Sequence, residues 1–169
     1  VGDSNQAAQQ AGVDAVAVFI DRCEGAAAQA ETLAPLLVTK AFSARTGTQQ
    51  RALEAVLLLL DVGAVEPTVE ALVKGLSDRK MRVPPLCMRA LRDGVERYGT
   101  AMPLARLAKV IKAHIGSPNK ELRDGCKELA VQLYGYMRDA LMAVLGDSLR
   151  AAQKAELEAA FAEVPAGRP

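Results

Sequence analysis

The sequence predicts an all-α fold, an α-solenoid of stacked HEAT-like helix pairs. Half of the 169 residues are apolar, but only six are Phe or Tyr and none is Trp. Such an aliphatic core is typical of helices, whereas β-sandwiches favour β-branched and aromatic residues. Apolar residues recur with the 3.6-residue period of a helix. The breaks inside successive helix pairs lie about 35–40 residues apart, which suits a two-helix repeat. The alternative is a globular all-α bundle without repetition.

The first half of the chain predicts five helices. The first follows Asp3-Ser4-Asn5 and ends near residue 23, with an apolar face of Val13, Val16, Phe19, Ile20 and Cys23. The next four are expected at about 30–42, 49–60, 66–76 and 84–98, each with apolar residues at helical spacing. The last of these opens on Pro84-Pro85, and proline is tolerated in a first turn.

The second half predicts four more helices. They are expected at about 104–115, 119–137 and 138–145, and from just after Ser148, as the N-cap residue, to near residue 164. TPR repeats have a similar length, but no repeat here carries the TPR pattern, so HEAT-like pairs are favoured. Residues 1–165 are predicted to form a single domain, with repeats near 1–24, 30–61, 66–98, 103–137 and 138–164. Residues 166–169 are its C-terminal tail.

Composition narrows the classes of function. The net charge of +1 argues against a general nucleic-acid-binding protein. No membrane span or signal peptide is recognisable, so we expect a cytosolic or nuclear protein. The three cysteines, Cys23, Cys87 and Cys126, lie far apart among apolar neighbours and form no zinc pattern. We expect all three to be buried and reduced, and we expect no metal or cofactor.

Catalytic patterns are absent or out of place. The stretch "GDSL", Gly146 to Leu149, names a family of serine hydrolases, in which the nucleophile follows a strand and has a downstream histidine. Here the serine lies between predicted helices, and the only histidine, His114, lies upstream. No P-loop, GxGxxG or HExxH is present. We therefore expect a protein that is not an enzyme.

The charged residues divide between the two edges of the predicted array. In a stacked array the turns within pairs share one edge and the turns between pairs share the other. Each within-pair turn is counted together with the helix start that follows it. The first carries +2, from Arg45 and Arg51, and the second carries +2, from Asp78, Arg79, Lys80 and Arg82. The third carries +1, from Lys120, Glu121 and Arg123. The opposite edge sums to −4. Helix N-termini add partial positive charge to the basic edge, so we predict a row of anion sites for an acidic protein surface.

Residues 118–141, 149–165 and 69–83 together carry a resemblance to one known family. The most specific stretch is "PNKELRDGCKELAVQLYGYMRDAL", Pro118 to Leu141. It resembles the fifth repeat of a TOG domain, the HEAT-repeat module of microtubule polymerases related to the tumour-overexpressed-gene protein, and the three stretches together resemble the later part of such a domain. "LRAAQKAELEAAFAEVP", Leu149 to Pro165, is similar to the closing helix of these domains. "VEALVKGLSDRKMRV", Val69 to Val83, resembles the first helix and turn of the fourth repeat. The resemblance runs from about residue 33 to 165, with the stretches in the family's order.

The resemblance implies a flat paddle that binds the αβ-tubulin heterodimer, and hence microtubules, through its within-repeat loops. The binding residues it implies are Ser4, Asn5, Arg45, Thr46, Gly47, Arg51, Arg79, Lys80, Arg82, Asn119, Lys120 and Arg123. The family's first repeat, with its tryptophan loop, has no counterpart in this sequence, which is either a fragment of such a domain or a divergent domain without that anchor. Without an aromatic anchor we expect weak, salt-sensitive binding.

The resulting hypothesis is a monomeric, non-catalytic tubulin-binding module in a regulator of microtubule plus-end growth. Such a protein is expected in the cytoplasm, at the microtubule, spindle or centrosome, or in the axoneme. The alternative is a HEAT-type interaction scaffold in a ciliary or spindle assembly, with a partner other than tubulin.

Overall fold

The secondary structure is helical, without strands, in the part of the chain that the computed structural model describes, residues 1–2 and 5–165. There the chain forms an α-solenoid of HEAT-like helix pairs, which confirms the predicted fold class. The nine α-helices of this described part are α1 (Gln6–Arg22), α2 (Ala30–Leu36), α3 (Thr46–Asp61), α4 (Val65–Gly75), α5 (Val83–Tyr98), α6 (Leu104–His114), α7 (Lys120–Met137), α8 (Asp139–Leu145) and α9 (Ala151–Ala162). Short 3₁₀ turns span Ala26–Gln29, Gly99–Ala101 and Gly146–Ser148. The chain divides within α5 into two compact units, Val1–Ala90 and Leu91–Pro169, called unit 1 and unit 2 below.

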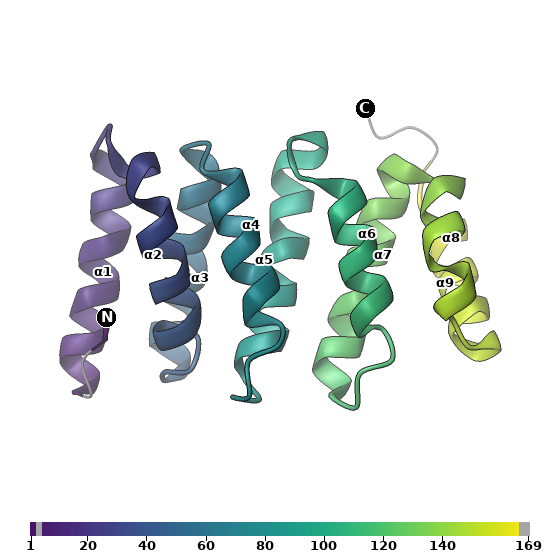
Figure 1. Cartoon of the computed structure of the whole chain (residues 1–169), viewed down its shortest axis with the longest axis horizontal. Helices are drawn as coiled ribbons and strands as arrows, with labels where there is room; N and C mark the ends of the chain where they lie inside the picture. The colour runs from purple at the N-terminus through teal and green to yellow at the C-terminus, as the bar shows by residue number, and fades with distance from the viewer. Residues whose placement is uncertain (3–4, 166–169) are drawn as a thin grey trace. The chain divides into compact units, whose positions relative to one another are not determined.

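Unit 1 contains two layers of helices. Helix α1 packs against α3, and α2 packs against α4 (Figure 1). Pro35 lies inside α2, which continues from Leu37 to Ala41 as a π-helical turn. The turn closes where the N–H of Phe42 donates to the carbonyl of Leu37 at 3.1 Å, and the Phe42 ring is fully buried.

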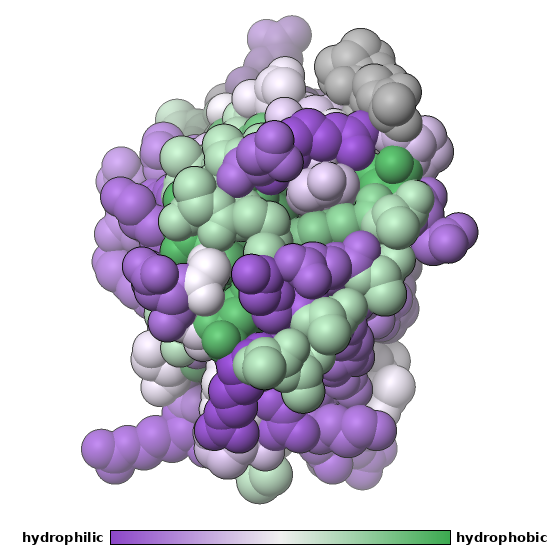
Figure 2. Space-filling model, turned by 90° about the vertical axis from the view of Figure 1, so that its right-hand side faces the viewer, coloured by the Kyte–Doolittle hydropathy of each residue, from purple (hydrophilic) through white to green (hydrophobic). Residues whose placement is uncertain are grey.

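Unit 2 repeats the arrangement with the end of α5 and helices α6 to α9. Helix α6 packs against α7 and α8, and α7 packs against α9. The Tyr134 ring of α7 stacks on the Phe161 ring of α9, with 4.0 Å between centroids. Figure 2 shows the face formed by α8 and α9, where hydrophilic side chains alternate with apolar ones and no single apolar patch covers it.

Helix α3 begins three residues earlier than predicted. Thr46, Gly47 and Thr48, expected in a loop, form its first turn. Arg45 is extended in the N-cap position and its carbonyl accepts from the N–H of Gln49 at 2.9 Å, which closes that turn. Glycine favours turns, but a first helical turn tolerates it at a modest cost.

The predicted apolar face of α1 was partly wrong. The buried residues are Val13, Ala17 and Ile20, whereas Phe19 is exposed. The buried stripe is centred on Ala17, and a residue two positions along a helix points to nearly the opposite side. Cys23 is also exposed, since it adopts an extended conformation after the last turn of α1. Cys87 and Cys126 are buried and free, as predicted.

The prediction that Ser148 is an N-cap was also wrong. Its hydroxyl donates to the carbonyl of Leu145 at 2.7 Å, inside a 3₁₀ turn that follows α8. Helix α9 begins later, at Ala151, with Arg150 in the N-cap position. The hydroxyl therefore satisfies an orphan carbonyl at a helix end, a common alternative use of serine. The assignment of one domain to residues 1–165, with its five repeats, stays a prediction, and the tail at 166–169 lies outside the described residues.

Candidate functional site

Three predicted loops lie at one end of unit 1. The ammonium group of Lys80, in the turn after α4, donates to the carbonyl of Thr39 at 3.2 Å and to the Ser43 hydroxyl at 3.0 Å. The Thr48 hydroxyl at the start of α3 donates to the side-chain carbonyl of Gln10 in α1 at 2.7 Å. The starts of α1, α3 and α5 are thus held together by side chains.

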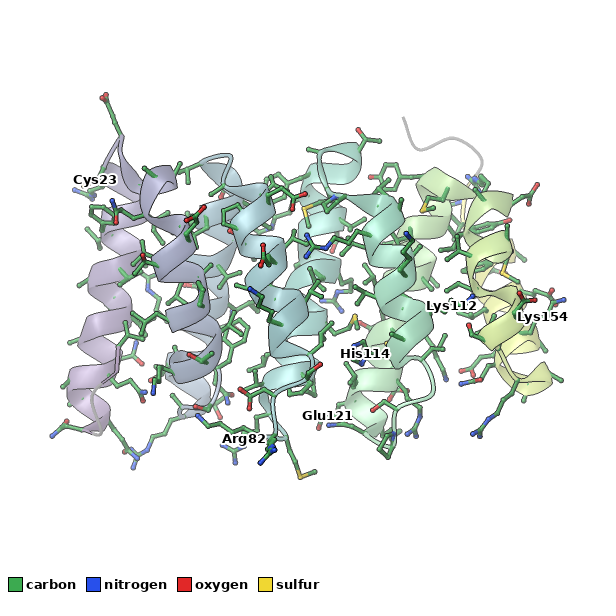
Figure 3. All side chains as sticks on the ribbon, in the orientation of Figure 1. Cys23, Arg82, Lys112, His114, Glu121 and Lys154 are labelled. Carbon is green, nitrogen blue, oxygen red and sulfur yellow. The ribbon has the colours of Figure 1, made fainter. Side chains whose placement is uncertain are left out.

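The turn between α4 and α5, residues 76–82, is the most basic of these. Its shape comes from Asp78, whose carboxylate accepts from the N–H of Lys80 at 2.8 Å, and from the Lys80 carbonyl, which accepts from the N–H of Val83 at 2.9 Å. Arg79 and Arg82 are exposed, and Arg82 projects from the end of the helices in Figure 3. The turn therefore displays cations that its own fold does not need.

Three cations of unit 1 are available to a partner. The side chains of Arg45, Arg79 and Arg82 are exposed and make no hydrogen bond or ion pair with any residue that the structure describes. The three stand on neighbouring turns of one unit, as the edge count predicted. The further prediction that Lys120 falls on the same line joins two units and stays a prediction.

Two other predicted contact residues of unit 1 are engaged internally. The Arg51 guanidinium donates to Glu54 at 2.8 Å and to Asp14 at 3.0 Å. The hydrogen bonds with Glu54 and Asp14 raise the pKa of Arg51, which is charged at any physiological pH. Arg51 therefore holds α3 against α1, and Lys80 holds its turn. The charge summed from the sequence for the basic edge was too high, because that sum left out Asp14 on the facing helix α1.

The turn between α6 and α7, residues 115–119, is built differently. Asn119 is the N-cap of α7, with its side-chain oxygen accepting from the N–H of Leu122 at 3.2 Å. One Arg123 nitrogen, Nη1, donates to the carbonyls of Ser117 at 2.7 Å and Pro118 at 2.9 Å. Lys120 is exposed, and its ammonium group has no partner among the described residues. Asn119 and Arg123 thus shape the turn, and Lys120 projects from it.

The remaining predicted residues lie at helix starts. The Asn5 side chain caps α1, accepting from the N–H groups of Ala7 at 3.0 Å and Ala8 at 3.2 Å. Thr46 and Gly47 are exposed in the first turn of α3. Ser4 lies outside the described residues. Since the first N–H groups of a helix have no partner within it, these starts contribute partial positive charge to the same end of unit 1.

Sequence reasoning missed Met81. Its side chain is 78% exposed between Lys80 and Arg82, the highest exposure among the large apolar side chains that stand out from the described surface. The signal was an apolar residue inside a charged turn, where neither a core nor a helix face requires one. Methionine is flexible and polarizable, and it is common on adaptable binding surfaces.

No catalytic or metal centre emerges from the described residues. They contain no group of three or more His, Cys, Asp or Glu side chains placed to hold a metal ion. His114 is half-buried at the end of α6, and burial lowers its pKa. None of the described helices combines the length and the apolar character needed to cross a bilayer.

Comparison with known proteins shows the family of the domain. The family model described as XMAP215/Dis1/CLASP, TOG domain, matches residues 1–161. The chain belongs to the TOG domain family. The resemblance of the three sequence stretches is therefore confirmed, and it extends to the beginning of the chain.

The relatives include proteins of spindle poles and centrosomes. Spindle pole body component alp14 of Schizosaccharomyces pombe is 32% identical over 174 residues, which cover 99% of this chain and 21% of that protein. Centrosomal protein 224 of Dictyostelium discoideum is 27% identical over 98% of this chain and 8% of its own length. The chain thus spans less than a quarter of each of these relatives.

A solved structure supports the fold. It comes from work on tubulin recruitment and assembly by microtubule polymerases with TOG domain arrays, and it superposes with a TM-score of 0.84 at 20% identity. The match covers 98% of this chain and 37% of that chain. The helix-pair architecture of a TOG domain is therefore present here.

Proposed function

We propose that this TOG domain is a non-catalytic module that binds the αβ-tubulin heterodimer in a microtubule-associated regulator of plus-end growth. The observation that carries the proposal is the group of exposed cations without internal partners, Arg45, Arg79 and Arg82, at one end of unit 1. Lys120 provides the corresponding cation in unit 2. Relatives at spindle poles and centrosomes, and a structural neighbour studied for tubulin recruitment, support this partner and a place at the microtubule cytoskeleton.

The proposed contact surface separates residues that touch tubulin from residues that hold the surface in shape. Arg45, Arg79, Arg82 and Lys120 make the contacts, with Thr46 and Gly47 offering the N–H groups of the α3 start. The supporting group consists of Asn5, Arg51, Lys80 and Asn119, whose side chains bond within their own unit. Arg123 holds its turn through Nη1 and keeps its other donor groups for a partner. Ser4 is kept as a contact residue by its place before Asn5 in the family's loop.

Met81 adds an apolar contact to this charged surface. Long-range attraction between charges speeds association, but much of the affinity of an interface comes from side chains buried in partner pockets. Met81 stands at the tip of the turn and is flanked by cations, so a partner that pairs with Arg79 and Arg82 also covers its thioether. We expect Met81→Ser to weaken tubulin binding several-fold, measured by anisotropy, while leaving the unfolding midpoint unchanged.

The alternative function is an interaction scaffold that uses broad helical faces. Such a scaffold needs a contiguous exposed apolar patch. Among the described residues, the exposed large apolar side chains are Val18, Phe19, Val62 and Met81, which lie on three separate elements. The basic turns are therefore the better-supported binding surface.

The experiment is charge reversal of the four free cations, with Arg45, Arg79, Arg82 and Lys120 replaced by Glu in this chain. We expect affinity for αβ-tubulin to fall at least about a hundredfold. Each introduced Glu would face acidic groups of the partner, and such contacts between like charges cost several kcal/mol. Affinity of the unaltered chain should fall steeply with added salt.

The matched control reverses four other exposed cations, Arg22, Arg97, Lys109 and Lys112, and so makes the same change in net charge. The control should keep most of its affinity, because these residues lie on helix faces and at other helix ends. Equal losses in both variants would show that total charge, and not this surface, governs binding. Full binding by the first variant would refute the proposal.

A further inference from the structure

Unit 2 has a basic hollow next to the turn that carries Lys120. Its volume is about 490 Å³. One wall is the turn 116–118 with the Arg123 side chain, and the other is the start of α9 with Arg150, Ala152 and Gln153. No acidic side chain lines this hollow in the described part of the chain. Neither arginine therefore meets a carboxylate of its own protein there.

Arg123 is held in a fixed orientation at this site. Its Nη1 group bonds two carbonyls, and its Nε and Nη2 groups have no partner among the described residues. A guanidinium offers its donors in a planar fork that matches the two oxygens of a carboxylate. Because the side chain is already ordered by the protein, a ligand does not have to immobilise it.

The opposite wall is fixed as well. The Gln153 side chain accepts from the N–H of Arg150 at 3.0 Å and donates to the carbonyl of Ile115 at 3.0 Å. This bridge joins the start of α9 to the end of α6, so the two walls keep their separation. The Arg150 side chain is exposed at the rim, and its guanidinium makes no hydrogen bond or ion pair with a described residue.

From this arrangement we infer that the hollow binds carboxylate side chains of an extended acidic peptide segment on the protein partner. Arg123 receives one carboxylate in the hollow, and Arg150 pairs with a second at the rim. A nucleic acid would require a longer basic track, and the chain as a whole carries a net charge of only +1. Arg150 and the start of α9 were not among the contact residues expected from the sequence.

This inference deepens the proposed function and rests on it for the identity of the partner. Lys120 and the hollow share one turn, so a partner seated on Lys120 has the hollow within reach of its neighbouring acidic residues. The binding surface would then continue from the α6–α7 turn to the α8–α9 turn of unit 2.

The test uses the whole 169-residue chain and a fluorescein-labelled hexaglutamate peptide, followed by anisotropy. We expect saturable binding and no binding of a matched hexaglutamine peptide. Arg150→Gln should weaken hexaglutamate binding about fivefold, and Arg97→Gln, an equal change of charge at the end of α5, should leave it within about twofold. Arg123→Lys tests whether the planar guanidinium is needed. Lysine keeps the positive charge but lacks the planar pair of donors, so this variant should weaken hexaglutamate binding about as much as Arg150→Gln.

Several outcomes would overturn the inference. These are equal losses in the Arg150 and Arg97 variants, binding of hexaglutamine, or displacement of the peptide by inorganic phosphate at equal carboxylate and phosphate concentration. Tighter binding of a single-stranded oligonucleotide than of hexaglutamate would indicate a different class of partner. The peptide assay contains no tubulin, so Arg150-dependent peptide binding without tubulin binding would refute the proposed partner and leave this site standing.

Discussion

The turns 76–82 in unit 1 and 115–119 in unit 2 achieve the same end by different means. Each uses one cation to hold its shape: Lys80 reaches the helix pair before it, whereas Arg123 bonds the carbonyls of its own turn. The first turn leaves Arg79, Met81 and Arg82 exposed, and the second leaves Lys120. Charges that look alike in a sequence thus differ in role: Lys80 holds the surface in shape, Arg79, Arg82 and Lys120 face a partner, and Arg123 does both.

The largest expected difference between the two turns is in binding. Arg79→Glu with Arg82→Glu should lower affinity for αβ-tubulin about a hundredfold, and Lys120→Glu about fivefold, because the first change reverses two neighbouring charges around Met81. Titrations of both variants at one salt concentration measure this. A greater loss from Lys120→Glu would show that unit 2 carries the dominant contact.

The stability of unit 1 should depend on Gly75, the last residue of α4 before its turn. A Cβ atom there would lie 2.5 Å from both the Cys87 sulfur and a Val38 methyl, so Gly75→Ala should lower the free energy of unfolding by about 2 kcal/mol. The control is Gly47→Ala in the first turn of α3, where no atom lies within 4 Å. It should raise stability by at most about 1 kcal/mol in urea unfolding. Equal behaviour of the two variants would contradict the close packing at Gly75.

Lys80 and Arg82 should separate positioning from contact. Lys80→Gln removes the bonds to Thr39 and Ser43, so amide hydrogen exchange in residues 77–82 should become faster, with a stability loss below about 1 kcal/mol. Arg82→Gln should leave exchange unchanged and weaken tubulin binding directly. An unchanged rate of amide hydrogen exchange in the Lys80 variant would contradict the role of Lys80 in holding this turn.

The smallest effect concerns pH in unit 2. Burial lowers the pKa of His114 from its ordinary 6.5, so the unfolded chain takes up a proton more readily than the folded one. Stability is therefore full above pH 6.5 and falls as the pH drops below it, until the folded pKa is passed. Urea unfolding at pH 7.5 and 5.5 should show this loss, and His114→Gln should reduce it. A larger loss in the variant would contradict the assignment to His114.

The fold could be predicted because its signals are local. Apolar periodicity placed every long helix to within a few residues. The errors at Phe19, Cys23 and Ser148 have a common cause. Periodicity finds a helix, but the neighbour that packs against it decides which face is buried and where the next helix begins.

The candidate site was predicted in outline only. Composition and spacing gathered Arg45, Arg79 and Arg82, but Asp14, which pairs with Arg51, lies 37 residues away on another helix. Contacts of that separation depend on how the helices pack, so no local pattern indicates them. Met81 was overlooked for a related reason, since exposure is a property of the folded surface.

The three thiols differ in exposure, and this difference allows binding at the basic turns to be measured with a dye on one of them. Cys23 is exposed at the end of unit 1 opposite Arg82 (Figure 3), whereas burial raises the pKa of Cys126 to about 12 and that of Cys87 further. A maleimide dye at neutral pH will therefore attach at Cys23, remote from the exposed arginines of unit 1, because the other two thiols are buried. Cys87 and Cys126 become reactive only when the helices unfold. The same reagent can therefore report partner binding through the dye at Cys23 and the rate of unfolding through the two buried thiols.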